Sequence, residues 1–330
     1  MAASALSALL DDRALVDDVR SLSNVSNARA AAAIVRQWVV IAATVWLAIY
    51  VDRWWAYLPA MIVIASRQHA LGIIMHDATH HRLFTSRAVN EYVSNLFCAF
   101  PMAMSTQGYR GEHLAHHLNT STDDDPYYRM FEADAVWHWP KSRAAALRQV
   151  LADVSGWNTL KNVAMFRRWM PLTQWFKHRD NPALRRRCAI DLAMNLVFWA
   201  CVAAVLTAVG GWTTFGLLWV VPGLTFYALF VRLRWISEHP YDPAAQAGYE
   251  TRHVRGTLWE RLTIAPLNIN FHIAHHLFPA VPWYRLPTVH ARLMQDAAYR
   301  AESEKYSTYL GGSRSMRSLL VQPAVASHAP

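Results

Sequence analysis

Four apolar stretches of about 20 residues place the strongest limit on how this chain can fold. They cover residues 34–51, 54–74, 189–209 and 212–231. Each is close to the length that a helix needs to cross the roughly 30 Å of hydrocarbon in a bilayer. Only Asp52 and Arg53 separate the first two stretches, and Gly210 and Gly211 separate the last two. We therefore predict an all-α integral membrane protein with four transmembrane helices in two hairpins.

The composition agrees with a membrane setting. Hydrophobic residues make up 54% of the 330 residues, more than in most soluble domains. A net charge of +9, together with 15 Trp and 13 Tyr, suits a basic membrane-facing surface with aromatic anchors. We expect no nucleic-acid partner, because the basic residues lie between the apolar stretches rather than in one patch. The three cysteines are widely spaced, so they predict neither a disulfide framework nor a thiolate zinc site.

The distribution of Lys and Arg predicts the orientation in the membrane. The linkers inside the two hairpins hold only Arg53, whereas residues 82–187 hold 15 Lys or Arg. By the positive-inside rule, both termini and this central segment are cytoplasmic. We treat the whole chain as one domain, since no internal repeat is present. Within it we expect an N-terminal cytoplasmic segment (residues 1–33), a first hairpin (34–74) and a central cytoplasmic part (75–188). A second hairpin (189–231) and a C-terminal cytoplasmic part (232–330) follow.

Four shorter segments carry weaker signals. Residues 92–105 are apolar but too short for a span and contain Pro101, so they form either a re-entrant or interfacial piece or a buried core helix. Residues 141–187 mix aromatic and basic side chains, which favours interfacial helices over a solvated helix pair. The first 24 residues are predicted to form a short amphipathic helix. The tail after Ser307 is expected to be frayed.

Nine of the 16 histidines fall into three short motifs, HDATHH, HLAHH and HIAHH. They are His76, His80, His81, His113, His116, His117, His272, His275 and His276. The spacing places at least two imidazoles of each motif on one face of a helix. A single histidine is more often a core residue with ordinary hydrogen bonds, but three such motifs indicate metal binding. All three follow or precede spans on the predicted cytoplasmic side, so they can meet in a cytoplasmic helical cap.

The number of imidazoles indicates two metal ions. A tetrahedral zinc site takes four ligands, fewer than the motifs supply. Imidazole binds Fe, Cu, Zn and Ni, so the ligand type alone leaves the metal open. His239, just past the fourth apolar stretch, is a candidate for a further ligand.

Several polar residues beside the motifs are candidates for supporting roles. Asn268 lies one helical turn before the third motif, where its amide is a candidate to hold a metal-bound water. Three carboxylates adjoin motif histidines and are candidates to accept the second ring N–H, with simple surface exposure as the alternative. They are Asp77, Glu112 and Glu238. For the aspartates at 123–125 we favour a turn and helix cap over contact with a substrate headgroup.

In the form and order of the histidine motifs around two hairpins, the chain resembles the membrane fatty acid desaturase and hydroxylase superfamily. The resemblance covers roughly residues 34–290. It implies a di-iron centre held by the nine motif histidines, O2 as oxidant and a long apolar tunnel. His239, in the R-x-x-x-E-H context of Arg234 and Glu238, looks like an additional ligand in related enzymes. In the first motif both His80 and His81 are available as the second ligand, and the resemblance leaves this choice open.

The resemblance implies an oxidoreductase, an O2-dependent desaturase acting on a fatty acyl or lipid-like chain in the membrane. No protein side chain removes hydrogen from a methylene group, so the metal ions and O2 must supply that reactivity. Electrons are expected from a separate protein, a ferredoxin or similar, because the sequence shows no cytochrome b5 pattern, iron-sulfur motif or nucleotide-binding motif. The closest alternative is a di-iron hydroxylase or oxygenase of a carotenoid, alkane or sphingolipid. A non-catalytic metal-binding or transport protein is a more distant alternative. Such a protein would have its ligands near the middle of the spans, whereas the histidine motifs here lie at the predicted cytoplasmic ends.

The predicted orientation can be tested with single cysteines. A membrane-impermeant thiol reagent should label Gly211→Cys in intact cells and should not label Arg186→Cys, because the two positions are predicted to face opposite sides. The reverse pattern would invert the topology and remove the histidine motifs from the cytoplasm.

Overall fold

Helices supply the regular structure in the computed structural model, which describes residues 6–161, 167–239 and 251–321. Within these ranges the only β-type pairings are isolated bridges. Four helical stretches are long and apolar enough to cross a membrane. They are α2 (Asn27–Val51), α3 (Trp54–Thr79), α11 (Pro182–Ala208) and the stretch Trp212–Glu238. The predicted all-α architecture with four candidate spans is confirmed.

The fourth stretch is a series of short helical pieces rather than one regular helix. It contains α12 (Trp212–Phe215), the π-helix η7 (Gly216–Val220), α13 (Val221–Leu224) and α14 (Phe226–Glu238). Pro222 follows the π-helix closely, and a proline cannot donate to the preceding turn. The break therefore has a local cause, and α14 forms the end that approaches the histidine motifs.

The helix ends differ from the limits of the apolar stretches. Helix α2 begins at Asn27 rather than residue 34, because the side chain of Ser26 accepts a hydrogen bond from the N–H of Arg29 and caps the helix. It ends at Val51, and the following Asp52 adopts a left-handed conformation with φ of 45°. Helix α3 continues to Thr79, five residues past the predicted limit. Caps and packing, rather than hydropathy, set these boundaries.

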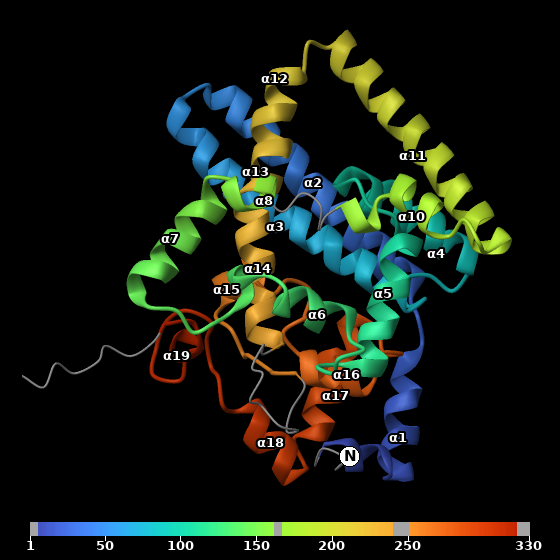
Figure 1. The fold of residues 1–330 in the computed structure, drawn as a ribbon, viewed down its shortest axis with the longest axis vertical. Helices are drawn as coiled ribbons and strands as arrows, with labels where there is room; N and C mark the ends of the chain where they lie inside the picture. Colours follow the sequence, from blue (N-terminus) through green and yellow to red (C-terminus); the bar gives the residue numbers. More distant parts are fainter. Residues whose placement is uncertain (1–5, 162–166, 240–250, 322–330) are drawn as a thin grey trace, which may run out of the picture.

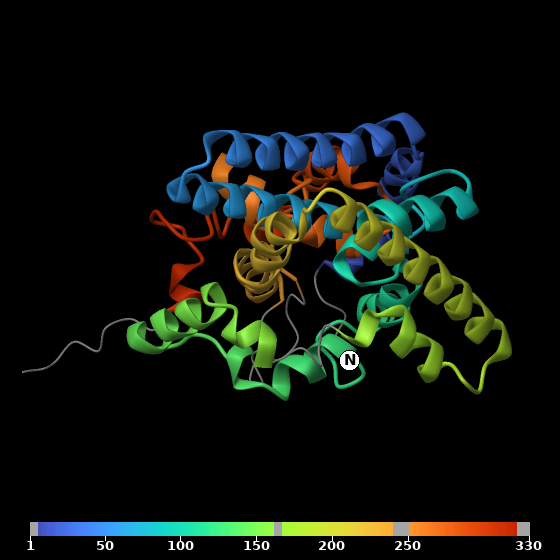
Figure 2. The same cartoon turned by 90° about the horizontal axis from the view of Figure 1, so that it is seen from above.

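Helix α3 is the central element of the structure. It packs beside α2, as both views show, and it also contacts α14 and α5 (Figures 1 and 2). In its most apolar window 61% of the residues are buried, compared with none in the corresponding window of α11. Helix α11 meets α12 at the Gly210 turn and then diverges from α14 (Figure 1). The first pair of spans is thus closely packed, whereas α11 lies largely exposed.

Polar residues in α3 face the protein, as expected for such residues inside a span. Arg67 donates to the side chain of Gln37 on α2, and both Gln68 and His69 are buried. Each of these α3 residues also donates to a main-chain carbonyl. Arg67 donates to Leu262, Gln68 to Trp219 and His69 to Thr263. The polar contacts tie α3 to η7 and to α15 (Leu258–Thr263).

Of the elements between the second and third spans, α4, α5 and η3 contact α3, whereas α7 contacts α14 and α10 contacts α11. Residues 92–102 lie in α4 (Arg87–Ser94), the π-helix η3 (Asn95–Ala99) and the 3-10 helix η4 (Phe100–Met102), and residues 103–105 connect η4 to the next helix. Cys98, Ala99 and Phe100 in this segment are fully buried, which favours the buried-core interpretation. The further elements are α5 (Thr106–Asn119), α6 (Pro126–Glu132), η5 (Ala135–Trp137), α7 (Arg143–Val154), α8 (Trp157–Lys161), η6 (Arg167–Trp169) and α10 (Pro171–Lys177).

The prediction of interfacial helices in residues 141–187 stays a prediction. Leu147, Leu151, Trp157 and Phe176 are exposed there, as an interfacial position requires. Phe166, which contributes to the same pattern, lies outside the described residues.

The N-terminal and C-terminal parts pack together. The predicted amphipathic helix is present as α1 (Arg13–Arg20), flanked by η1 (Ser7–Leu10) and η2 (Ser21–Ser23). Its buried Val19 shares a core with Val289 and Leu293 of α17 (Leu286–Leu293). The other C-terminal elements are α16 (His272–Leu277), η8 (Trp283–Arg285), α18 (Ala297–Ser303) and α19 (Arg317–Leu320).

The expectation of a frayed tail is wrong for residues 308–321. Tyr309 and Met316 are almost completely buried in this segment. The carboxylate of Glu260 accepts hydrogen bonds from the main-chain N–H groups of Tyr309 and Leu310, at 3.0 and 2.9 Å. This long-range anchor, which local sequence does not reveal, holds the segment against α15.

Candidate metal centre

Four helix segments bring the motif histidines to one place. The first motif lies at the end of α3, the second on α5, and the third forms α16, while His239 directly follows α14. The ends of α5 and α14 lie beside α16 (Figure 1). Helix α5 starts where it does because the Ser105 side chain caps it by accepting from the N–H of Gly108 at 2.9 Å. The three motifs, far apart in sequence, thus meet as predicted.

The first group of imidazoles contains five histidines. One nitrogen from each lies within 4.8 Å of the others, and the members are His76, His80, His113, His117 and His275. The Nε2 atom of His113 is 2.9 Å from that of His80 and 3.0 Å from that of His117. The Nε2 atom of His117 is in turn 3.1 Å from that of His275. Several ring nitrogens therefore point at a common space.

The second group contains four histidines next to the first. His116, His239 and His276 place one nitrogen each within 4.8 Å of one another, and His239 also groups with Glu238 and His272. The Nε2 atoms of His239 and His272 are 2.7 Å apart. The ring of His276 stacks on that of His117, with centroids 4.2 Å apart, so the two groups adjoin.

The nitrogen positions fit two bound metal ions. Ligand nitrogens that share one ion at bond lengths of about 2.0–2.1 Å are about 3 Å apart when the bonds are at right angles. The observed separations of 2.7–3.1 Å match this spacing. In addition, both ring nitrogens of His76 and the Nε2 atoms of His116 and His276 are buried without a hydrogen-bond partner. Buried polar atoms are normally paired, and a metal ion would satisfy one nitrogen of each of these rings, the one that carries the lone pair.

Burial also keeps the imidazoles of His80 and His117 in the form that binds metal. It lowers the pKa of His80 to about 3, with the charge of Arg110 acting in the same direction, and the pKa of His117 to about 2. Neutral imidazole has a lone pair available for a metal ion, whereas the imidazolium cation does not.

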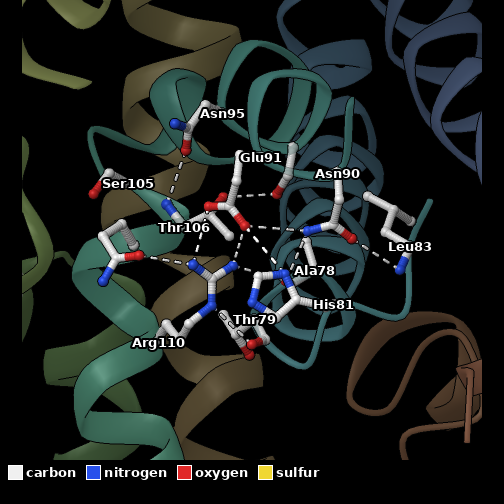
Figure 3. Close-up of polar contacts among 12 residues, drawn as sticks. Ala78, Thr79, His81, Leu83, Asn90, Glu91, Asn95, Ser105, Thr106 and Arg110 are labelled. Carbon is white, nitrogen blue, oxygen red and sulfur yellow. Dashed lines mark hydrogen bonds and ion pairs between the residues drawn. The ribbon is translucent and has the colours of Figure 1, made fainter. Parts of the chain in front are cut away.

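The structure distinguishes the two candidates in the first motif. His80 lies in the group of five, whereas His81 lies outside both groups. His81 has a left-handed backbone with φ of 56°, and its side chain is 36% exposed. Its Nδ1 atom is 3.5 Å from Oε1 of Glu91, and Figure 3 shows the ring beside Glu91 and Arg110. The geometry thus favours His80 as the metal-facing residue.

Asp125 has a role at this site that the sequence analysis missed. As predicted, it caps a helix: Oδ1 accepts from the N–H of Tyr127 at the start of α6. Its Oδ2 atom also accepts from Nδ1 of His116 at 2.9 Å and from the N–H of Ser121 at 2.9 Å. The contact fixes the His116 tautomer and leaves Nε2 as the nitrogen that faces the second group. An aspartate nine residues after a motif histidine gave no signal by itself.

Two of the predicted supporting carboxylates lie near motif histidines. Oδ1 of Asp77 is 3.6 Å from Nδ1 of His76, and Oε2 of Glu238 is 3.6 Å from Nδ1 of His272. Both distances exceed a hydrogen bond. Asp77 accepts instead from the main-chain N–H of Trp283 at 2.8 Å, and Glu238 accepts from Nε of Arg234 at 2.6 Å.

Glu112 and Asn268 have other partners in the structure. Glu112 accepts from Nε1 of Trp169 at 2.9 Å and from Nζ of Lys177 at 3.1 Å, because neighbouring residues on a helix point in different directions. Asn268 donates to the main-chain carbonyl of Trp283 at 3.3 Å. It does not lie one helical turn before His272, because α16 starts only at that histidine.

Comparisons with known proteins agree with this geometry. The family model described as fatty acid desaturase matches residues 52–307. The dihydrorhizobitoxine desaturase of Bradyrhizobium elkanii is 26% identical, over 90% of this chain and 84% of that protein. The sn-1 oleoyl-lipid 12-desaturase of Anabaena variabilis is 23% identical, over 73% of this chain and 70% of that protein.

A chloroplastic omega-6 fatty acid desaturase of Glycine max is 24% identical over 68% of this chain. The match covers about half (53%) of the length of that protein. The family model extends over most of the chain and includes all three histidine motifs. The chain belongs to the fatty acid desaturase family.

Proposed function

We propose that this protein is a di-iron desaturase that uses O2 to introduce a double bond into a fatty acyl or lipid-like chain. The observation that carries the proposal is the pair of adjoining imidazole groups. One ion would be held by His76, His80, His113, His117 and His275, and the other by His116, His239, His272 and His276. Bound iron would supply the O2 chemistry that attack on an unactivated C–H bond needs.

Aromatic side chains exclude water from one side of this site. The ring of Tyr109 stacks on His113 with centroids 5.1 Å apart, and the ring of Tyr127 lies 4.8 Å from that of His116. Trp169 and Trp235 pack behind these tyrosines, and all four residues are buried. A dry environment protects a reactive site from side reactions with water. This aromatic layer therefore suits oxidation of an apolar substrate.

The reaction requires an outside source of electrons. Desaturation takes two hydrogens from the substrate, and O2 becomes two molecules of water, so two further electrons and two protons are needed. We propose that a separate electron-transfer protein, a ferredoxin or similar, supplies the electrons. The excess of basic residues, with a net charge of +9, would favour an acidic partner.

We propose the membrane arrangement that the sequence predicts. The four candidate spans would form two hairpins of one domain, and the other helices a cytoplasmic cap that carries the metal centre. The 15 basic residues between 82 and 187 support the cytoplasmic location of this cap and of both termini.

Isotope labelling with 18O2 tests the reaction type. Membranes from cells with and without the chain should be incubated under 18O2, and both lipids and polar metabolites should be analysed by mass spectrometry, since one relative is named for dihydrorhizobitoxine rather than a fatty acid. We expect a product that has lost two hydrogens and carries no label. A product containing 18O would support the hydroxylase alternative, and the lack of any chain-dependent product would contradict the proposal.

Paired alanine substitutions test the choice within the first motif. His80→Ala should abolish turnover and lower the iron content, because it removes a nitrogen from the group of five. His81→Ala should keep most of the activity and iron, because this side chain faces Glu91 and solvent. Iron analysis and product formation measure both effects. Equal losses in the two variants would mean that the site is arranged differently.

Asp125→Asn separates two roles of one side chain. Asn caps helices about as well as Asp, so α6 should persist while the negative partner of His116 is lost. Loss of such a partner typically weakens metal binding by about 10–100-fold. Asp124→Asn, a change of an exposed neighbour, is the matched control and should bind iron normally. Normal iron affinity in Asp125→Asn would show that the contact with His116 is dispensable.

A further inference from the structure

We infer that Arg110 and Glu91 form a clamp that positions the first histidine motif against the second. Arg110 lies on α5, three residues before His113, and reaches the end of α3, which leads into His80. Glu91 lies on α4 and holds the guanidinium in place. The inference rests on the proposed function, since the clamp would act through the histidines. Figure 3 shows Arg110 and Glu91 with the residues around them.

The clamp binds two buried main-chain carbonyl groups at the C-terminal end of α3. Nε of Arg110 donates to the carbonyl of Thr79 at 2.9 Å, and Nη2 donates to the carbonyl of Ala78 at 3.0 Å. The last carbonyls of a helix have no partner within it, and a positive charge there is favourable. The Thr79 carbonyl belongs to the same peptide group as the nitrogen of His80. Fixing this peptide therefore fixes the point from which the His80 side chain leaves the backbone.

Glu91 compensates for the burial of this arginine. Arg110 is only 8% exposed, and a buried cation without a partner is strongly destabilising. Oε2 of Glu91 accepts from Nη1 at 3.1 Å, and Oε1 accepts from Nη2. Gln107 accepts a further bond from Nη1 at 2.8 Å. All three nitrogens of the guanidinium are thus engaged, which holds its plane in one orientation.

Asn90, next to Glu91, holds the chain that follows α3. Its Nδ2 donates to the carbonyl of Ala78 at 2.9 Å, and its Oδ1 accepts from the N–H groups of Leu83 and Phe84 at 3.1 and 3.3 Å. These contacts stabilise the turn in which His81 takes its left-handed conformation. Together α4 and Arg110 direct His80 into the metal centre and His81 out of it.

A lysine cannot replace Arg110 in this arrangement. Its single ammonium group lacks the planar fork that contacts two carbonyls and a carboxylate together. Arg110→Lys would keep the charge but lose the fixed link between α3 and α5. Metal affinity depends on how well the ligands are held before binding, and loss of supporting contacts typically lowers it about 10–100-fold. We therefore expect weaker metal binding with the fold retained.

The test is titration of the metal-depleted full chain with Co²⁺, monitored by stoichiometry and by the visible absorption of the bound ion. Wild type should bind two ions per chain. Arg110→Lys should bind at least one ion about tenfold more weakly, with an altered spectrum. Arg232→Lys is the matched control, because Arg232 is equally buried at 7% exposed and pairs with Asp153 at 2.8 Å, yet it contacts α7 rather than the end of α3. It should bind cobalt as wild type does.

Thermal unfolding of each variant separates misfolding from mispositioning. If Arg110→Lys does not fold, Glu91→Gln replaces it, since this change keeps the shape and removes the charge that holds Arg110. Wild-type affinity and spectrum in the folded variant, or equal losses in Arg232→Lys, would overturn the clamp. Failure of wild type itself to bind cobalt would instead contradict the proposed function.

Discussion

The burial of nine imidazole rings in one small volume is the constraint on which the rest of this structure depends. Their nitrogens approach one another to 2.7–3.1 Å, and several have no hydrogen-bond partner. Without a further binding partner such an arrangement leaves polar atoms unsatisfied, at a cost of about 1–3 kcal/mol each. Two metal ions would satisfy one nitrogen of each ring, the one that faces the ion. Metal binding and the folding of this region are therefore expected to be coupled.

The side chains that orient the imidazole rings come mostly from outside the three histidine motifs. Asp125, the cap residue of α6, orients His116. Arg110 and Glu91 link the end of α3 to α4 and α5. Helix α3 is itself fixed by polar contacts to α2 and α15. The metal centre thus depends on helix ends and caps as much as on the histidine spacing.

Most of the architecture followed from strong periodic signals. Long apolar stretches predicted the four candidate spans, and the HxxHH spacing predicted which imidazoles share a helix face. Long-range contacts were not predictable. The role of Glu260 depends on a partner about 50 residues further along the chain. The role of Asp125 depends on the turn after α5, which folds back to His116. The direction of Glu112 depends on contacts with Trp169 and Lys177, and the choice of His80 on the turn after α3.

The metal content of the purified protein tests the central claim most directly. Elemental analysis of the chain, extracted in mild detergent from cells supplied with iron, should give close to two iron ions per chain. The two adjoining groups of imidazoles predict this number. A reproducible content of one zinc ion with no iron would contradict the account, since it would remove the oxidative chemistry on which the proposed function depends.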